Sequence, residues 1–478
     1  MDIKNAEVEP QKNIAILDRS IVFPNSETPR KAALNSLQKN IINSLNKLII
    51  AINLILLGHV TYNKNQYELF MTYQIGIFIL EFLGKDFIIG LMKYLFEDIH
   101  EKELYNIYIR IKSSLVFLIL ILLYPFSILS YYIIKLLLKN NFEVYSESII
   151  KEVYFKFLLF APVIYLFEIL FLLNIQFLHY KDKNIAVFLY SLFFIITHIV
   201  LSYILLYILE KGLIGLTISY FVNSFLFYLF TNQYIKSVIE KENQSFFFLV
   251  PNKENFDEDG LIILKENSIL SIYNLGDIFM FQFIFLSSLF TDKNQLIINI
   301  IYINFYQIVF AICRGFYYSL KNYILKNKED LRKRQEYVTI FSIYYIMLVL
   351  SIFVILLIFK NFLLNLYLFR SDGKELQKIS YKLRIIYPIC ILISCVRMIL
   401  NAMLRGMNIP FSLKKKIFYI IIYVILGLTL CFYYYYGIFG LWISALVLNI
   451  FFILESVYKS YIHLPELFQS DLHFVPIS

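Results

Sequence analysis

Long apolar runs recur along nearly all of the 478-residue chain and limit its fold more than any other feature. A helix needs about 20 apolar residues to cross the roughly 30 Å hydrocarbon core of a bilayer, since each residue advances it by about 1.5 Å. The runs reach this length and do not alternate polar with apolar residues, as the strands of a membrane barrel would. The sequence therefore predicts an all-α protein that crosses a lipid bilayer many times.

Twelve runs are predicted as transmembrane helices. Their limits are 38–60, 67–94, 113–134, 153–178, 184–209, 213–231, 261–290, 296–320, 338–359, 383–404, 417–434 and 439–457. These limits divide the chain into five parts. The parts are a cytoplasmic tail over 1–37, a six-helix bundle over 38–231, a polar cytoplasmic linker over 232–260, a second six-helix bundle over 261–457, and a cytoplasmic tail over 458–478.

Lys and Arg residues gather in alternate connecting segments, which favours an orientation with both chain ends in the cytoplasm. The formal net charge is +9. We do not interpret it as nucleic-acid binding, because no basic stretch interleaved with aromatic residues occurs outside the spans. In this orientation the four tyrosines at 433–436 lie at the outer interface, where amphipathic rings are favoured.

One eight-residue pattern, G-x-x-G-L-x-I-S, occurs twice, at 212–219 and 437–444, with an offset of 225 residues (437 − 212). Pro162 and Pro388 repeat at nearly the same offset, 226 residues (388 − 162). Because each half holds an even number of spans, both halves enter the membrane from the same side. The sequence thus predicts two six-helix bundles related by a parallel repeat, an arrangement in which secondary transporters bind substrate between the halves.

Ionisable residues inside the spans are the first candidates for function, because charge at membrane depth is costly. Asp277 lies in the middle of the seventh span, and the repeat places Asn53 of the first span at an equivalent position. A carboxyl group there can take up a proton on one side and release it on the other. The plain alternative is a structural partner for a nearby donor such as Asn274.

The second span carries a cluster of ionisable residues, Glu81, Lys85 and Asp86, and the fourth span carries Glu168. Glu81 and Lys85 are four residues apart on one helix, which predicts an internal ion pair that needs no function. Glu168 in the fourth span has no partner nearby in the sequence, so it is a candidate to face a cavity in the N-terminal half.

Motifs of enzymes and of metal sites are absent from the sequence. There is no H-E-x-x-H, P-loop or G-x-S-x-G pattern, and the four cysteines lie in apolar runs without a C-x-x-C spacing in a loop. Of the six histidines, only His198 lies clearly within a span. A membrane enzyme would place it in a cavity among polar partners, whereas a histidine that faces lipid would exclude that role. We predict a protein that is not an enzyme and has no cofactor.

Four short motifs resemble those of the multidrug and toxic compound extrusion (MATE) transporters of the MOP flippase superfamily. The first span ends in Gly-His-Val at 58–60, like the family's G-H-L-G, and the fourth ends at Gln176, like F-L-Q-x-Q. The tenth ends in Leu-Arg-Gly at 404–406, like L-R-G-x-G, and 437–442 reads like G-x-x-G-L-W. Their order and spacing extend the resemblance from the first span to the last.

The resemblance implies two six-helix bundles around a V-shaped cavity, and the export of organic cations or other amphiphiles in exchange for protons or sodium. It also maps family carboxylates onto this chain. The two acids of the seventh helix fall on Asp277 and Gln282, that of the tenth on Ser394, that of the eighth near Phe305 and that of the first on Asn53. One of these family carboxylates is therefore retained.

The preferred prediction is a secondary active antiporter that acts as a monomer in the plasma membrane or an endomembrane. Its substrate would be a small organic cation or amphiphile, and its coupling ion a proton or sodium. The predicted site residues are Asp277, Gln282, Asn53, Glu168 and Gln176.

Two alternatives remain open. A lipid-linked oligosaccharide flippase of the same superfamily would need a basic cavity to receive pyrophosphate. The spans offer only Lys47, Lys85 and Arg397, with Arg314 if it faces inward, so the exporter is favoured. The other alternative is a polytopic membrane enzyme.

Overall fold

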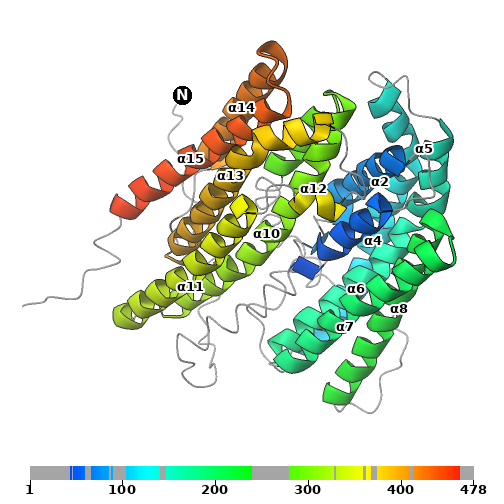
Figure 1. Cartoon of the computed structure of the whole chain (residues 1–478). Helices are drawn as coiled ribbons and strands as arrows, with labels where there is room; N and C mark the ends of the chain where they lie inside the picture. The colour runs from blue at the N-terminus through cyan, green and yellow to red at the C-terminus, as the bar shows by residue number, and fades with distance from the viewer. Residues whose placement is uncertain are drawn as a thin grey trace, which may run out of the picture.

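In the computed structural model of the chain, the described residues form helices joined by short turns (Figure 1). These residues are 44–45, 47–59, 66–85, 88–89, 104–139, 147–181, 183–239, 279–327, 330–358, 362–367, 374–407, 409 and 413–462. Asp277, a predicted site residue, lies outside the described residues.

The N-terminal bundle holds six spans, three of which contain a π-helical turn (η) with i→i+5 bonding. The first helix is Lys47–Gly58, and the second is α2 (Gln66–Leu80) continued by η2 (Glu81–Lys85). The third is α4 (Leu104–Lys139). The fourth combines α5 (Glu147–Val153), η3 (Tyr154–Leu158) and α6 (Ala161–Tyr180), the fifth α7 (Asn184–Tyr203) and η4 (Ile204–Ile208), and the sixth is α8 (Gly212–Ile239).

The C-terminal bundle repeats this plan. Its first helix is described over Phe279–Ser288. The helices that follow are α10 (Lys293–Lys326), α11 (Leu331–Ile358), the short α12 (Phe362–Tyr367), α13 (Lys374–Gly406), α14 (Leu413–Leu428) continued by η6 (Thr429–Tyr433), and α15 (Ile438–Ile462).

Nine helices of the described residues are long and apolar enough to cross a membrane, and three shorter apolar helices match the predicted first, second and seventh spans. The chain is therefore a multi-pass membrane protein, and the predicted all-α fold of twelve helices in two bundles is confirmed. Helix ends differ from the predictions. α8 continues to Ile239 rather than ending at Thr231, and α4 begins at Leu104 rather than at Ser113. Backbone hydrogen bonds extend these helices beyond their apolar runs.

The backbone shows the parallel repeat directly. The π-turns η4 and η6 begin at Ile204 and Thr429, which are 225 residues apart (429 − 204). Each is followed by two residues in the left-handed region at the same offset. In the first half these are Glu210 (φ 47°) and Gly212 (φ 59°), and in the second they are Tyr435 (φ 57°) and Gly437 (φ 57°). The repeated sequence pattern thus forms the same corner in both bundles.

A second glycine of the pattern brings the two helices of each corner together. A Cβ atom on Gly215 would lie 2.9 Å from the carbonyl oxygen of Leu205, and one on Gly440 would lie 2.8 Å from the carbonyl carbon of Leu430. Real Cβ atoms do not approach backbone this closely. The pattern therefore needs Gly at this position for packing, in addition to the φ of the first glycine.

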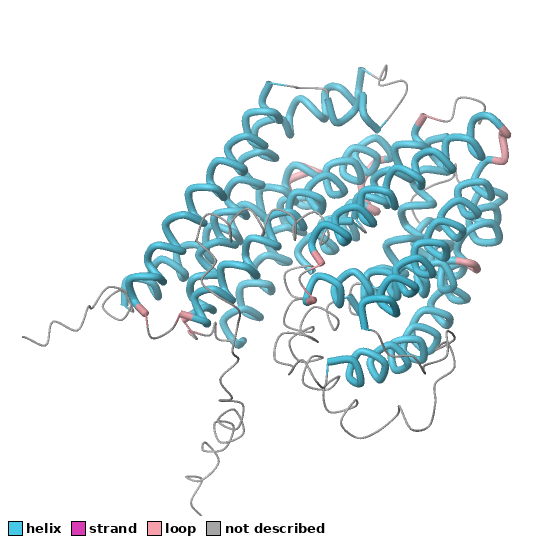
Figure 2. The backbone as a smooth tube through the Cα atoms, turned by 90° about the horizontal axis from the view of Figure 1, so that it is seen from below, coloured by secondary structure: helices cyan, strands magenta, loops and turns pink. Residues whose placement is uncertain are grey.

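The two bundles lie side by side, with α2, α4, α6, α7 and α8 on one side and α10, α11, α13, α14 and α15 on the other (Figures 1 and 2). Contacts between them involve residues that the predicted orientation places toward the outer side. The rings of Phe78 and Phe285 lie 4.5 Å apart, and His59 Nε2 lies 2.9 Å from the carbonyl oxygen of Leu366. In Figure 1, α11 and the lower ends of α7 and α8 lie well apart at the bottom of the view.

Candidate functional site

A row of charged side chains crosses the N-terminal bundle. Lys47 Nζ, on the first helix, lies 3.0 Å from Glu81 Oε2 on η2. Glu81 Oε1 lies 3.5 Å from Lys85 Nζ, and Lys85 Nζ lies 2.7 Å from Glu168 Oε2 on α6. The Tyr220 hydroxyl, on α8, donates a hydrogen bond of 2.6 Å to the same Glu168 oxygen. We call these five residues the charged cluster.

The centre of the charged cluster is removed from water. The side chains of Lys85 and Glu168 are 0% and 1% exposed, and that of Glu81 is 6% exposed. The Lys85 ammonium also lies 4.1 Å from the centroid of the Tyr165 ring, a cation–π contact that gains strength where water is excluded. Buried charges persist only when they are paired and hydrogen-bonded. Two lysines and two glutamates are ion-paired here, with a formal charge of zero.

Local sequence explains part of this arrangement. Glu81 and Lys85 lie four residues apart in η2, so their side chains leave the helix on one side, and the predicted ion pair is confirmed. The pair is not self-contained, because Glu168 makes the shorter contact with Lys85. Glu81, Lys85 and Glu168 lie near the middle of the predicted spans 67–94 and 153–178.

Asn53 belongs to a hydrogen-bond network next to the charged cluster. Its Nδ2 donates to the Tyr73 hydroxyl at 3.2 Å, and its Oδ1 lies 2.7 Å from His198 Nε2. The His198 ring packs 5.3 Å from the ring of Tyr220, which bonds Glu168. The structure thus brings together two of the predicted site residues, Asn53 and Glu168, through two residues that were not predicted.

His198 is fully buried, so it does not face lipid. Its polar neighbour Asn53 belongs to the network just described rather than to a separate catalytic arrangement. The other predicted residues lie apart from this network. Gln282 is buried in the seventh helix, in the other bundle, and Gln176 is partly exposed near the C-terminal end of α6.

Comparison with known proteins identifies the fold. No model of a protein family matches the sequence, and no curated protein matches it either. Solved structures do match. The eukaryotic MATE transporter AtDTX14 is 14% identical, with 90% of this chain and 95% of that chain covered and a TM-score of 0.68. An inward-facing multidrug resistance MATE family transporter of the MOP superfamily is 13% identical, with coverages of 91% and 98% and a TM-score of 0.67. The chain has the MATE fold.

A third similar structure is a MOP superfamily transporter from Pyrococcus furiosus, described as having a binding pocket of reverse polarity that suggests a different function. It is 13% identical, with 93% of this chain and 98% of that chain covered and a TM-score of 0.65. The polarity of the interior is therefore the feature to compare within the MATE fold.

The two halves of this MATE fold differ in interior polarity. At an offset of 225, Glu81 and Lys85 correspond to Tyr306 and Phe310 (306 − 81 and 310 − 85). These two rings are stacked 6.3 Å apart and are buried among further aromatic side chains. At the offset of the proline pair, 226, Glu168 corresponds to Ser394. At these three positions, where the N-terminal bundle holds charges, the C-terminal bundle thus places two aromatic rings and a hydroxyl group. Arg397, which is buried and interacts electrostatically with Tyr306, is a charge in their neighbourhood.

Lys112 on α4 is a second buried cation of the N-terminal bundle, and it lies outside the charged cluster. It is 1% exposed, and its Nζ donates to Asn232 Oδ1 at 2.6 Å and to the Tyr108 hydroxyl at 3.4 Å. The Tyr228 ring lies 4.9 Å away. The apolar run of the third span begins only after Lys112, so the sequence places this residue in the preceding loop, whereas the structure buries it within α4.

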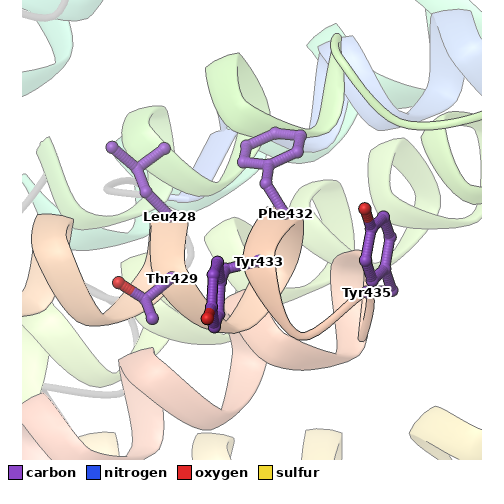
Figure 3. Close-up of a pocket in the computed structure, with 5 residues that line it drawn as sticks. All are labelled: Leu428, Thr429, Phe432, Tyr433 and Tyr435. Atoms are coloured by element: carbon purple, nitrogen blue, oxygen red, sulfur yellow. The ribbon is translucent and has the colours of Figure 1, made fainter.

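A hollow on the surface of the C-terminal bundle lies away from these groups (Figure 3). It is lined by residues of η6 and its flanks: Leu428, Thr429, Phe432, Tyr433 and Tyr435. The four tyrosines at 433–436 are all exposed, as expected for rings that anchor a helix end at the membrane interface. We assign this hollow to the membrane boundary rather than to the site.

An ion pair joins the two bundles of the MATE fold near the outer contacts. Glu68 Oε1 at the start of α2 lies 3.6 Å from Lys293 Nζ at the start of α10, with side chains 11% and 35% exposed. Partly exposed pairs contribute little stability, about 0–1 kcal/mol. The pair can therefore bias the outer side toward closure without locking it.

Glu68→Lys is expected to open the outer side, because it places two ammonium groups face to face. Phe285, which is 1% exposed at the contact with Phe78, provides the reporter as Phe285→Cys. Labelling of this cysteine by an impermeant maleimide should rise by up to about fivefold, the equilibrium change that about 1 kcal/mol allows. Adding Lys293→Glu restores opposite charges and should return labelling to its starting rate. Equal labelling of Phe285→Cys alone, with Glu68→Lys, and with Glu68→Lys and Lys293→Glu together would show that the ion pair does not affect opening of the outer side.

Proposed function

We propose that the chain is a secondary active antiporter that exports an organic cation or amphiphile in exchange for protons by alternating access. The MATE fold supports a transporter rather than an enzyme. Proteins of this fold have been solved as multidrug resistance transporters in outward-facing and inward-facing conformations. In this chain the moving bodies would be the bundles 38–231 and 261–457, with substrate between them.

The charged cluster is the observation that carries the coupling part of the proposal. Its two lysines and two glutamates balance, and Glu168 Oε1 has no hydrogen-bond partner among the described residues. That oxygen is the position at which a proton can add. Protonation would change the charge of the cluster from zero to +1.

This change links proton binding to cation release. With Glu168 ionised, the interior of the N-terminal bundle is neutral and tolerates a cationic substrate held against aromatic faces. With Glu168 protonated, Lys85 retains only Glu81, which it shares with Lys47, and the excess charge repels the substrate. Asp277 would provide a second carboxylate in the C-terminal bundle, whose described interior holds aromatic rings and the buried Arg397.

The flippase alternative is weaker because the lysines of the charged cluster are balanced by its glutamates. Lys47 and Lys85 were two of the cations available to a pyrophosphate site, and both are bound to carboxylates. Arg397 is 3% exposed and lies 5.2 Å from the Phe452 ring. Lys47 and Lys85 are therefore neutralised and do not give a cavity the net positive charge that a pyrophosphate site would need.

Asp277→Asn tests the proposal. In liposomes with an imposed pH gradient, the wild type should move a fluorescent organic cation against the proton flux, and Asp277→Asn should abolish this coupled movement. Asp292→Asn is the matched control, because Asp292 caps α10 outside the bundle interior and Asn is an equally good cap. No coupled movement by the wild type would remove the proposed function. Unchanged movement in Asp277→Asn would remove only the role of Asp277.

A further inference from the structure

We propose that Lys85 is a tethered cation that makes the proton, rather than sodium, the coupling ion of this chain. The inference rests on the antiport function proposed above and deepens it. The ammonium group of Lys85 already occupies the place where a coupling cation would bind, between the two interior carboxylates of the N-terminal bundle.

Three groups surround the buried ammonium of Lys85. Its Nζ lies 2.7 Å from Glu168, 3.5 Å from Glu81 and 4.1 Å from the Tyr165 ring, with no exposed side-chain surface. Two carboxylates and one aromatic face enclose it on three sides. This is the set of contacts that a bound monovalent cation would seek.

Sodium and a proton would respond differently to this lysine. A sodium ion retains its charge and needs several oxygen ligands, so at Glu168 it would lie within a few ångströms of the ammonium and be repelled strongly in a dry interior. A proton bonds to one oxygen and needs no ligand shell. Glu168 Oε1, which lacks a hydrogen-bond partner among the described residues, can accept it. The proton would come from water on one side and leave to water on the other.

Among the described residues, the remaining titratable groups near the centre of the charged cluster contribute rings rather than charges, and Asp86, next to Lys85 in the sequence, lies outside the described residues. Tyr73 on α2 interacts electrostatically with Glu81 and Glu168, and Tyr165, Tyr220 and His198 contribute rings. α4 packs against η2 and α6 as well. Among the α4 side chains that the structure describes, the buried titratable groups Tyr108 and Lys112 are bonded to Asn174 and Asn232 instead.

The elements that precede α6 carry two further described ion pairs close in sequence, and the first, Glu147 with Lys151 at 3.2 Å, is exposed. Glu152 on α5 and Lys156 on η3 lie 2.7 Å apart and are partly exposed, so they neutralise each other away from the buried cluster. The charge at Glu168 is therefore controlled by Lys85 and, through Glu81, by Lys47.

Lys85→Gln tests the inference directly. The variant keeps a side chain of similar length and leaves the cluster with a charge of −1 next to Tyr220, so sodium should now bind. We expect the unfolding temperature of the purified variant to rise by several degrees in sodium chloride relative to choline chloride, because a ligand of the folded state stabilises it. The wild type should show no such difference. Lys85→Gln/Glu168→Gln is the matched control, since its charge returns to zero and the response to sodium should disappear.

Transport supplies the second measurement. An imposed sodium gradient should drive cation export by Lys85→Gln about tenfold faster than by the wild type, which should respond to the pH gradient alone. Proton-driven transport by the wild type without any sodium response in Lys85→Gln would overturn the role of Lys85 and leave the antiport function standing. If Lys85→Gln does not fold, the wild type decides, because sodium-specific stabilisation or sodium-driven export by it would overturn the inference.

Discussion

Glu168→Gln is expected to reduce proton-driven export by about tenfold or more, since an ionisable group at this depth is a functional element whose removal ends the titration. Gln has nearly the same shape and can still accept the Tyr220 hydrogen bond. It cannot take up a proton on the oxygen that Glu168 leaves without a partner. Initial rates of export under a fixed pH gradient, compared with rates of exchange without a gradient, measure this loss.

The same variant should also be less stable, because it leaves Lys85 with half of its counter-charge. Removing one partner of a buried ion pair costs about 3–5 kcal/mol. Lys85→Gln/Glu168→Gln removes both charges and should unfold at a higher temperature than Glu168→Gln alone. The effects of these variants on stability and on transport can therefore be measured separately. The double variant is expected to regain stability and remain uncoupled, and proton-driven export at the wild-type rate in Glu168→Gln would contradict the coupling role of Glu168.

Gly215→Val and Gly440→Val are expected to produce similar, large losses of stability. In each case the new side chain meets the backbone of the facing helix end, at Leu205 or at Leu430. Overpacking of this kind costs about 1–3 kcal/mol, and more when backbone must move. Thermal unfolding in detergent and the yield of folded protein are the measurements.

Gly427→Ala provides the comparison for these two variants. A Cβ on Gly427 would approach the Phe283 ring at 2.9 Å and the Ser444 hydroxyl at 3.0 Å, both side-chain groups that can shift. We expect a smaller loss there. If the valine variants unfold at the same temperature as Gly427→Ala, the idea that the repeated glycines are needed for close backbone packing at the two corners is wrong.

The fold was predictable because its signals are local. An apolar run of sufficient length specifies a span by itself, and the repeated glycine pattern specifies a corner wherever it occurs. Helix ends were less predictable, as α4 and α8 show. Apolar residues stop at the membrane boundary, whereas backbone hydrogen bonding continues through the polar residues that follow, up to Ile239 in α8.

The site was only partly predictable, because most of its contacts join distant parts of the chain. Glu81 and Lys85 pair within one helix, so their spacing revealed them. The partner of Lys85 on α6 is 83 positions away (168 − 85), and nothing in the local sequence of Glu168 indicates a lysine. Tyr220 could not be predicted from the sequence for another reason. It is one of 39 tyrosines, and only the packing of α8 against α6 distinguishes it from those that face lipid.

The glycines of the two corners have a mechanical consequence. Glycine is often taken as a sign of a flexible joint, but here Gly215 and Gly440 allow one helix end to press directly on another. The pairs α7–α8 and α14–α15 are thereby braced and should move as rigid struts. The bending that alternating access requires must then occur elsewhere in the chain. Each bundle would rotate with these two corners unchanged in conformation.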